Sequence, residues 1–169
     1  ESTGVLVQET LPGGRKIIHK PRSDLEDARA RATLSFQKVI PDSRGSNGSF
    51  SELTTEFLQY DSRTNTPTRV RDPRGVVTRT DTNDRGLPVL VVEAETSDAE
   101  GSTSTEYNDL GLPVRVTNPN GHIIRLEYYE EAPFKGFLKT ATVDPGGLDL
   151  KTTYEWGPRG YPKTVTDPR

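Results

Sequence analysis

The sequence predicts an all-β fold made of serial antiparallel β-hairpins, with little helix. Three observations lead to this prediction. A turn phrase built on Pro and Gly recurs with a period near 23 residues and one degenerate copy, a spacing typical of repeat architectures. Apolar and polar residues alternate with a period of two between the turns, as they do in half-buried strands. Thr occurs 21 times, and its branched side chain suits a pleated surface.

The recurring phrase is a tight turn of the form Asx-Pro-x-Gly, where Asx is Asp or Asn. Pro sets φ, Gly permits a positive φ, and the Asx side chain can accept bonds from the amides beyond it. Copies occupy residues 72–75, 118–121, 144–147 and, in part, 167–169. A second kind, Asn-Asp-x-Gly, occupies residues 83–86 and 108–111, each followed by Leu-Pro-Val, and a looser copy occupies 157–160. Each repeat is therefore expected to read turn, strand, turn, strand.

Alternation assigns the apolar side chains of the strands between these turns to one face. The residues expected on such faces are Leu112, Val114 and Val116, then Ile124, Leu126 and Tyr128, and then Leu148, Leu150, Tyr154 and Trp156. Residues 97–104 are acidic and rich in Gly and Ser, and they stand where a Pro-Gly phrase is due. We expect them to form a longer turn in its place.

The first fifty residues fit the repeat period poorly. Residues 5–7, 16–19 and 33–40 are expected to be strands, and residues 43–49 a loop. A short helix over residues 24–32 is left open: Ser23 and Glu26 form a capping-box pattern, but the segment has no apolar stripe. The residues 1–59 are therefore treated as a divergent β-rich segment.

Composition limits the classes of function. The net charge of −3 over 169 residues gives no electrostatic case for binding nucleic acid, and no apolar run reaches membrane-spanning length. The chain has no Cys, so disulfides and thiol catalysis are excluded. Hydrophobic residues make up 30% of the chain, which predicts a thin core and a large solvent-exposed surface. We expect no cofactor, no metal, no membrane insertion, and a chain that is part of something longer.

The repeats carry a family resemblance. Residues 60–75 contain Tyr60-Asp61 and then Val70-x-Asp72-Pro73-x-Gly75. Residues 107–121 match the pattern Tyr-Asp-x-x-Gly-Leu-x-x-Val-x-Asp-Pro-x-Gly through nearly their whole length, and residues 154–168 match it with one change of spacing. The chain resembles Rhs and YD-repeat proteins over residues 60–169, with phrases near 60–75, 82–101, 107–121, 137–147 and 154–169. Thr82 departs from the pattern, because Tyr is expected there.

Local structural roles explain the residue types of the pattern. The Tyr ring can pack on a neighbouring strand while its hydroxyl reaches a polar partner, the Asx sets the turn, and Gly takes the positive φ. The predicted structural residues are Tyr60, Asp61, Asp72, Pro73, Gly75, Asp84, Gly86, Tyr107, Asp109, Gly111, Asn118, Pro119, Gly121, Asp144, Pro145, Gly147, Tyr154, Gly160, Asp167 and Pro168.

The resemblance implies a hairpin ribbon that forms part of a curved sheet or shell. Bacterial Rhs polymorphic toxins, the B–C components of Tc toxins and the teneurins are similar in this respect. By resemblance, the chain is expected to be a non-catalytic segment of a shell that encapsulates a toxin or other cargo, in a secreted or cell-surface protein that uses a bacterial export system. Its expected partners are the flanking segments of the same or a cleaved longer chain and the enclosed cargo. The alternative is an adhesive repeat module that binds surface glycans or a receptor.

Several residues allow a chemical reading that we weigh against a structural one. Residues 144–148 are similar to an Asp-Pro-x-Gly-Leu autoprotease sequence of Rhs proteins, but a further repeat follows them, which favours a turn. The chain's two histidines, His19 and His122, lack metal-ligand spacing. An anion site is conceivable at Arg63, Arg69, Arg71, Arg74 and Arg79, but solvated strand faces are favoured. An aromatic sugar-binding platform is conceivable at Tyr154, Trp156 and Tyr161, but core packing is favoured. A calcium loop is conceivable at Glu93, Glu95, Asp98 and Glu100, but a solvated turn is favoured.

Overall fold

The structure is a computed structural model that describes residues 8–11, 15–21, 33–40 and 52–168. In these ranges the regular structure is β-strand throughout, which confirms the predicted all-β class. The strands are β1 (Gln8–Thr10), β2 (Lys16–Pro21), β3 (Leu34–Ile40), β4 (Leu53–Tyr60), β5 (Pro67–Arg71), β6 (Val77–Thr82), β7 (Pro88–Glu93), β8 (Gly101–Tyr107), β9 (Pro113–Thr117), β10 (Ile123–Tyr128), β11 (Leu138–Val143), β12 (Leu150–Trp156) and β13 (Pro162–Thr166).

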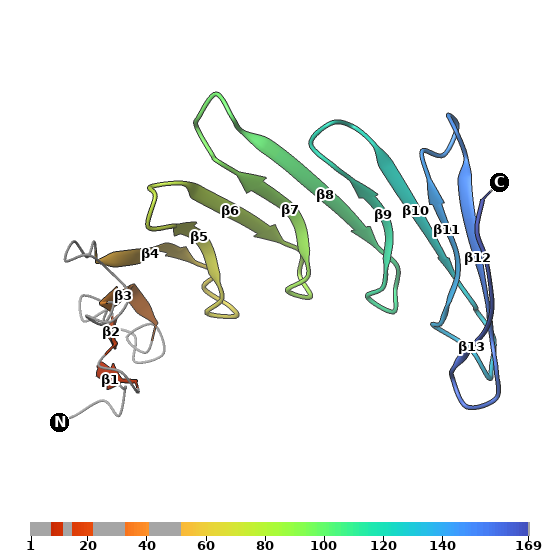
Figure 1. The fold of residues 1–169 in the computed structure, drawn as a ribbon, viewed down its shortest axis with the longest axis horizontal. Coiled ribbons are helices and arrows are strands. Elements are labelled where there is room, and N and C mark those ends of the chain that lie inside the picture. The colour runs from red at the N-terminus through yellow and green to blue at the C-terminus, as the bar shows by residue number, and fades with distance from the viewer. Residues whose placement is uncertain (1–7, 12–14, 22–32, 41–51, 169) are drawn as a thin grey trace. The chain divides into compact units, whose positions relative to one another are not determined.

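Consecutive strands are hydrogen-bonded neighbours, so the order of the described strands in the sheet is the order of the chain (Figure 1). The pairs with a defined register, from β1–β2 to β5–β6 and from β8–β9 to β12–β13, are antiparallel. The predicted serial hairpins are thereby confirmed. By its internal contacts the chain divides into two units, one of residues 1–80 and 93–99 and the other of residues 81–92 and 100–169.

The core of the described residues is thin, as the composition predicts. Val92 is the one apolar side chain among them that is buried, at 4% exposure, while Thr140 and Thr33 are buried polar residues. Burial in β8 alternates residue by residue, which is the period of two expected for a strand with one covered face. The described residues therefore contain no central cluster of buried apolar side chains.

Two expectations about loops are corrected. The turn that replaces the missing Pro-Gly phrase ends at residue 100, and residues 101–104 belong to β8, whose alternating Thr and Ser residues suit a strand. Leu148, expected on an apolar face, lies in the turn before β12 and is 73% exposed. Positive φ values at Asp144 and Asp149 extend that turn past Leu148, so the strand begins at Leu150.

The N-terminal predictions are confirmed where the structure describes them. β2 covers the strand predicted at 16–19, and β3 covers all but the first residue of the strand predicted at 33–40. The predicted strand at 5–7, the helix left open at 24–32 and the loop at 43–49 lie outside the described residues.

Candidate functional site

Four turns of the repeats share one hydrogen-bond pattern, which the turn at residues 72–76 shows. Asp72 Oδ1 accepts the backbone amides of Arg74 and Val76, both at 2.9 Å. The Gly75 amide donates to the Asp72 carbonyl at 2.9 Å, and φ of Gly75 is 88°. Because a side chain with Cβ is strained at this φ, the glycine is required by the backbone itself. Pro73 occupies the second position of the turn.

Asn83, Asn108 and Asn118 repeat this pattern. Each Oδ1 accepts the amides two and four residues further along the chain, at distances of 2.9–3.1 Å. In these four copies the two kinds of turn phrase therefore have one geometry. In the Asn-Asp-x-Gly copies the accepting residue is the Asn, so Asp84 and Asp109 stand at the position that Pro occupies in the other copies.

Sequence reasoning missed the capping roles of Asn83 and Asn108. The signal was present, because both stand three residues before a glycine, as Asp72 does before Gly75. The glycines of these copies and the looser copy have positive φ, as predicted: Gly86 (78°), Gly111 (80°), Gly121 (79°) and Gly160 (76°).

The turns at residues 61–66 and 144–149 are among those that differ from this pattern. Asp61, which follows Tyr60, accepts the amides of Arg63 and Thr64 at 2.9 and 2.8 Å, and the positive φ falls on Asn65. In the turn at residues 144–149 the glycine with positive φ is Gly146, whereas Gly147 was expected. Gly147 lacks a side chain for another reason: an added Cβ would overlap the Asp144 carboxylate, whose Oδ2 accepts the amide of Leu148. Pro145 lies inside this turn, and Asp167 and Pro168 follow β13.

Two of the turn carboxylates carry a depressed pKa. The amides of Thr64 and Arg63 lower the pKa of Asp61 by bonding its ionised form. Partial desolvation acts to raise the pKa of Asp72, but the bonds from the Val76 amide and from the Arg74 amide and guanidinium outweigh it, and the net shift is downward. Both carboxylates are therefore anionic hydrogen-bond acceptors that hold the turn.

A second repeated device links neighbouring strands through aromatic side chains. In β4, β8, β10 and β12, the last residue donates a side-chain hydrogen bond to the carbonyl of the first residue of the strand before it. The bonds run from Tyr60 Oη to Leu34 O (2.7 Å), from Tyr107 Oη to Pro88 O (2.8 Å), from Tyr128 Oη to Pro113 O (2.8 Å) and from Trp156 Nε1 to Leu138 O (2.7 Å). Each carbonyl lies where its strand begins, so the bond closes the end of the hairpin ladder.

A register shift accompanies these aromatic residues. The pairing with the following strand shifts just before Tyr60, Tyr107, Tyr128 and Trp156. Such bulges re-aim a side chain at the edge of a ladder. Tyr128 and Trp156 were not among the predicted repeat residues, although each follows a Glu, as Tyr107 does. The predicted Tyr154 instead accepts a bond at its carbonyl from Tyr129 Oη at 2.9 Å. Burial raises the pKa of Tyr128.

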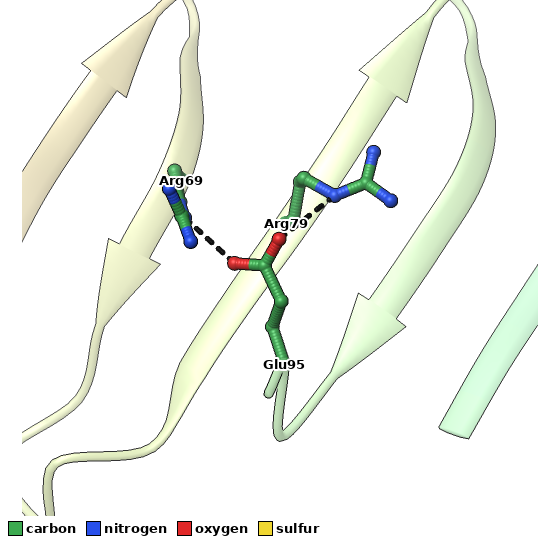
Figure 2. Close-up of polar contacts among 3 residues, drawn as sticks. All are labelled: Arg69, Arg79 and Glu95. Atoms are coloured by element: carbon green, nitrogen blue, oxygen red, sulfur yellow. Dashed lines mark hydrogen bonds and ion pairs between the residues drawn. The ribbon is translucent and has the colours of Figure 1, made fainter. Parts of the chain in front are cut away.

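The arginine-rich segment is neutralised by carboxylates from the same chain. Arg69 and Arg79 stand directly opposite each other on β5 and β6. Glu95 lies between them: Oε2 is 2.6 Å from Arg69 Nε, and Oε1 is 3.0 Å from Arg79 Nε (Figure 2). Arg71 pairs with Glu56 and Arg74 pairs with Asp72. These contacts oppose the reading of an anion-binding patch, because the positive charges already have partners.

The remaining chemical readings find structural roles. Glu95 of the acidic stretch is bound to two arginines, and no cluster of three or more metal-binding side chains occurs among the described residues. The Trp156 ring packs edge-on against Phe137 with centroids 5.1 Å apart, which is the predicted packing role. Tyr161 is 72% exposed. Within the described ranges, no helix has the length and apolarity needed to cross a membrane.

An open groove of about 980 Å³ lies beside the turn between β10 and β11. Its lining combines rings with both signs of charge, among them Tyr129, Phe134, Glu130 and Lys135. The Tyr129 and Phe134 rings lie 6.1 Å apart, so part of this lining is a packed aromatic pair.

The fold is shared with solved toxin structures. No protein-family model matches the chain, and no curated protein matches it. A crystal structure of TcdB2-TccC3-TEV aligns with a TM-score of 0.74 and 17% identity over 95% of this chain and 8% of that one. A crystal structure of TcdB2-TccC3-Cdc42 aligns with a TM-score of 0.65 and 12% identity, and a Photorhabdus luminescens Tc holotoxin pore with 0.63 and 11%; each covers 95% of this chain and 11% of the other. The chain spans about a tenth of the length of these chains, and at such identities the likeness shows the fold alone.

Proposed function

We propose that this chain is a non-catalytic structural segment of an Rhs/YD-repeat β-shell, and that the shell encloses a toxin or other cargo domain of a large secreted or surface protein. The observation that carries the proposal is the order of the sheet. Each described strand bonds to its neighbours in sequence, and 95% of the chain superposes on a small part of a much longer toxin chain. A ribbon of this kind can form a wall by adding hairpins at its ends.

The chemistry of the repeats supports a wall. Asp72, Asn83, Asn108 and Asn118 direct their side-chain oxygens to turn amides. The aromatic hydroxyl and indole groups bond to neighbouring strands. The polar groups that recur are thus engaged in holding hairpins together, which is what a structural segment requires and what a catalytic site does not explain.

The proposed partners follow from the same reading. They are the flanking hairpins of the same or a cleaved longer chain, and the domain that the shell encloses. The solved structures that this fold resembles include a Tc holotoxin pore, which supports placing the protein outside the producing cell. Thin burial also fits a segment of a larger assembly, since Val92 is the one buried apolar side chain among the described residues.

Cryo-electron microscopy of the longest natural protein that contains this sequence tests the proposal. We expect residues 52–168 to form part of a continuous wall around enclosed protein density. Hairpins that stand apart from any wall, or a wall with no protein inside it, would count against the proposed function.

Limited proteolysis of the same protein adds a test in solution. Thr140 is 4% exposed and its hydroxyl donates to Glu127 at 2.8 Å, so Thr140→Asp places two carboxylates side by side in the sheet. We expect the variant to open the wall and to make the enclosed domain protease-sensitive, whereas Ser102→Asp, at an exposed site on β8, leaves it resistant. If the enclosed domain is digested as fast in the unmodified protein as in Thr140→Asp, the result contradicts encapsulation.

A further inference from the structure

The outer edge of β13 continues two contact series that join the hairpins before it, from β7 to β12. We infer that this edge is a docking surface for one kind of partner: a β-hairpin whose first strand ends in Tyr or Trp and is followed by a turn with a positive-φ glycine. The inference rests on the proposed function, and it goes beyond it by specifying which side chains of this chain recognise the next hairpin.

The first series consists of carbonyl acceptors. In the described sheet, the first residues of β3, β7, β9 and β11 each accept a bond from an aromatic side chain at the end of the following strand. Pro162 is the first residue of β13, and it follows Leu138 at the spacing that separates Leu138 from Pro113, within one residue. Its carbonyl therefore stands where the next aromatic donor is due.

The second series joins every second turn. Among the turns that follow β6, β8, β10 and β12, the residue after a turn glycine covers the glycine two turns further along the chain. A Cβ built on Gly111 would lie 3.4 Å from Leu87 Cδ1, and one on Gly136 would lie 3.7 Å from Leu112 Cδ1. One on Gly160 would lie 3.5 Å from the ring of Phe137.

Tyr161 is the next member of this second series, since it follows Gly160 as Phe137 follows Gly136. It is 72% exposed, whereas Leu87 and Leu112 are half-buried. A glycine exposes flat backbone on which a ring can lie, and any larger residue would push the ring away. We therefore expect the Tyr161 ring to pack on the turn glycine of the docking hairpin.

The strand itself has the pattern of one that is paired on both sides. β13 and β9 share the sequence Pro-x-x-Val-Thr followed by Asx-Pro. In β9, Val116 stands opposite Ile124 of β10, whereas all residues of β13 are exposed and Val165 is 49% exposed. An apolar residue of the docking strand would cover Val165 as Ile124 covers Val116.

A second copy of this chain does not fit the requirement. The described edge strands of a copy are β1 and β13, and they end at Thr10 and Thr166, which carry no ring. A strand such as β10, which ends at Tyr128, does fit. The occupant is therefore a further hairpin with the chemistry of the repeats.

The experiment extends the full chain after Arg169 with a copy of residues 121–128 followed by a copy of residues 108–117. This supplies an apolar strand, a terminal tyrosine and a glycine turn. Hydrogen exchange of residues 162–166 is then measured by mass spectrometry in the chain with and without the extension. We expect exchange of these residues to be at least tenfold slower with the extension. When the terminal tyrosine of the added strand is replaced by Phe, we expect exchange to be about fivefold faster than with Tyr.

Tyr161→Ala tests the second series without altering the extension. Because Tyr161 is exposed, we expect Tyr161→Ala to leave urea unfolding of the original chain unchanged and to speed exchange of residues 162–166 in the extended chain. The inference is overturned if the extension gives no protection, or if the Tyr and Phe extensions and Tyr161→Ala all give equal protection. In the latter case the edge accepts any strand, and the proposed shell still stands.

Discussion

Glu95 provides the sharpest test of how the hairpins are held, because it bridges two arginines that face each other. Like charges directly opposite on neighbouring strands destabilise a sheet. Glu95, at 13% side-chain exposure, accepts one bond from Arg69 and one from Arg79, and its own amide donates to the Val77 carbonyl. We predict that Glu95→Gln destabilises the β5–β6 hairpin although its shape is kept.

The magnitude follows from the exposure of the partners. Charge-assisted bonds contribute about 1.5–3 kcal/mol each when they are well buried, but Arg69 and Arg79 are 40% and 33% exposed, so solvent screening reduces each to about 1 kcal/mol. The uncovered repulsion between the two guanidinium groups adds a few tenths of a kcal/mol. The expected cost of Glu95→Gln is therefore about 2 kcal/mol, and salt at 1 M should shrink it by screening the charges.

Urea unfolding followed by far-ultraviolet circular dichroism measures this cost, and hydrogen exchange of residues 67–82 locates it. Glu93→Gln is the matched control, because Glu93 is exposed and lies two residues before Glu95, so the variant loses the same charge. A Glu95→Gln variant as stable as Glu93→Gln, or a loss that does not depend on salt, would refute the bridging role.

Three further predictions concern the repeat devices. Tyr128→Phe removes the hydroxyl bond to the Pro113 carbonyl and should cost about 1 kcal/mol in urea unfolding, whereas Tyr161→Phe at an exposed site should cost nothing measurable. Gly111→Ala should cost about 1–2 kcal/mol by the same assay, because φ is 80° there. The folded-state pKa of Asp72 lies below its ordinary value of 3.8, so its contribution to stability is full above that pH and is lost as the pH falls through the lowered pKa. Thermal unfolding from pH 6 to 2.5 should show a smaller loss of stability in acid for Asp72→Asn, which keeps the accepting oxygen. An equal loss of stability in the two proteins would contradict this assignment.

The turn chemistry could be predicted from the sequence because its interactions are local. The bonds that form the turn at Asp72 reach no further than Val76, and the glycine requirement at Gly75 is a property of the backbone. The same locality explains why the strands of the repeats were found: alternation and turn residues act over a few positions. Gly146 and Gly147 could both take the positive φ of their turn, and the sequence did not decide between them.

Contacts between distant residues could not be predicted in this way. The aromatic donors reach carbonyls 15 to 26 residues earlier in the chain, and Glu95 meets Arg69 across 26 residues. Each of these depends on the register of the strands between the two residues. By itself the sequence determined the hairpins and their order, because the bonds of the Asp and Asn turns close within five residues. The tertiary structure decided which side chains join one hairpin to the next, because strand register sets those distances.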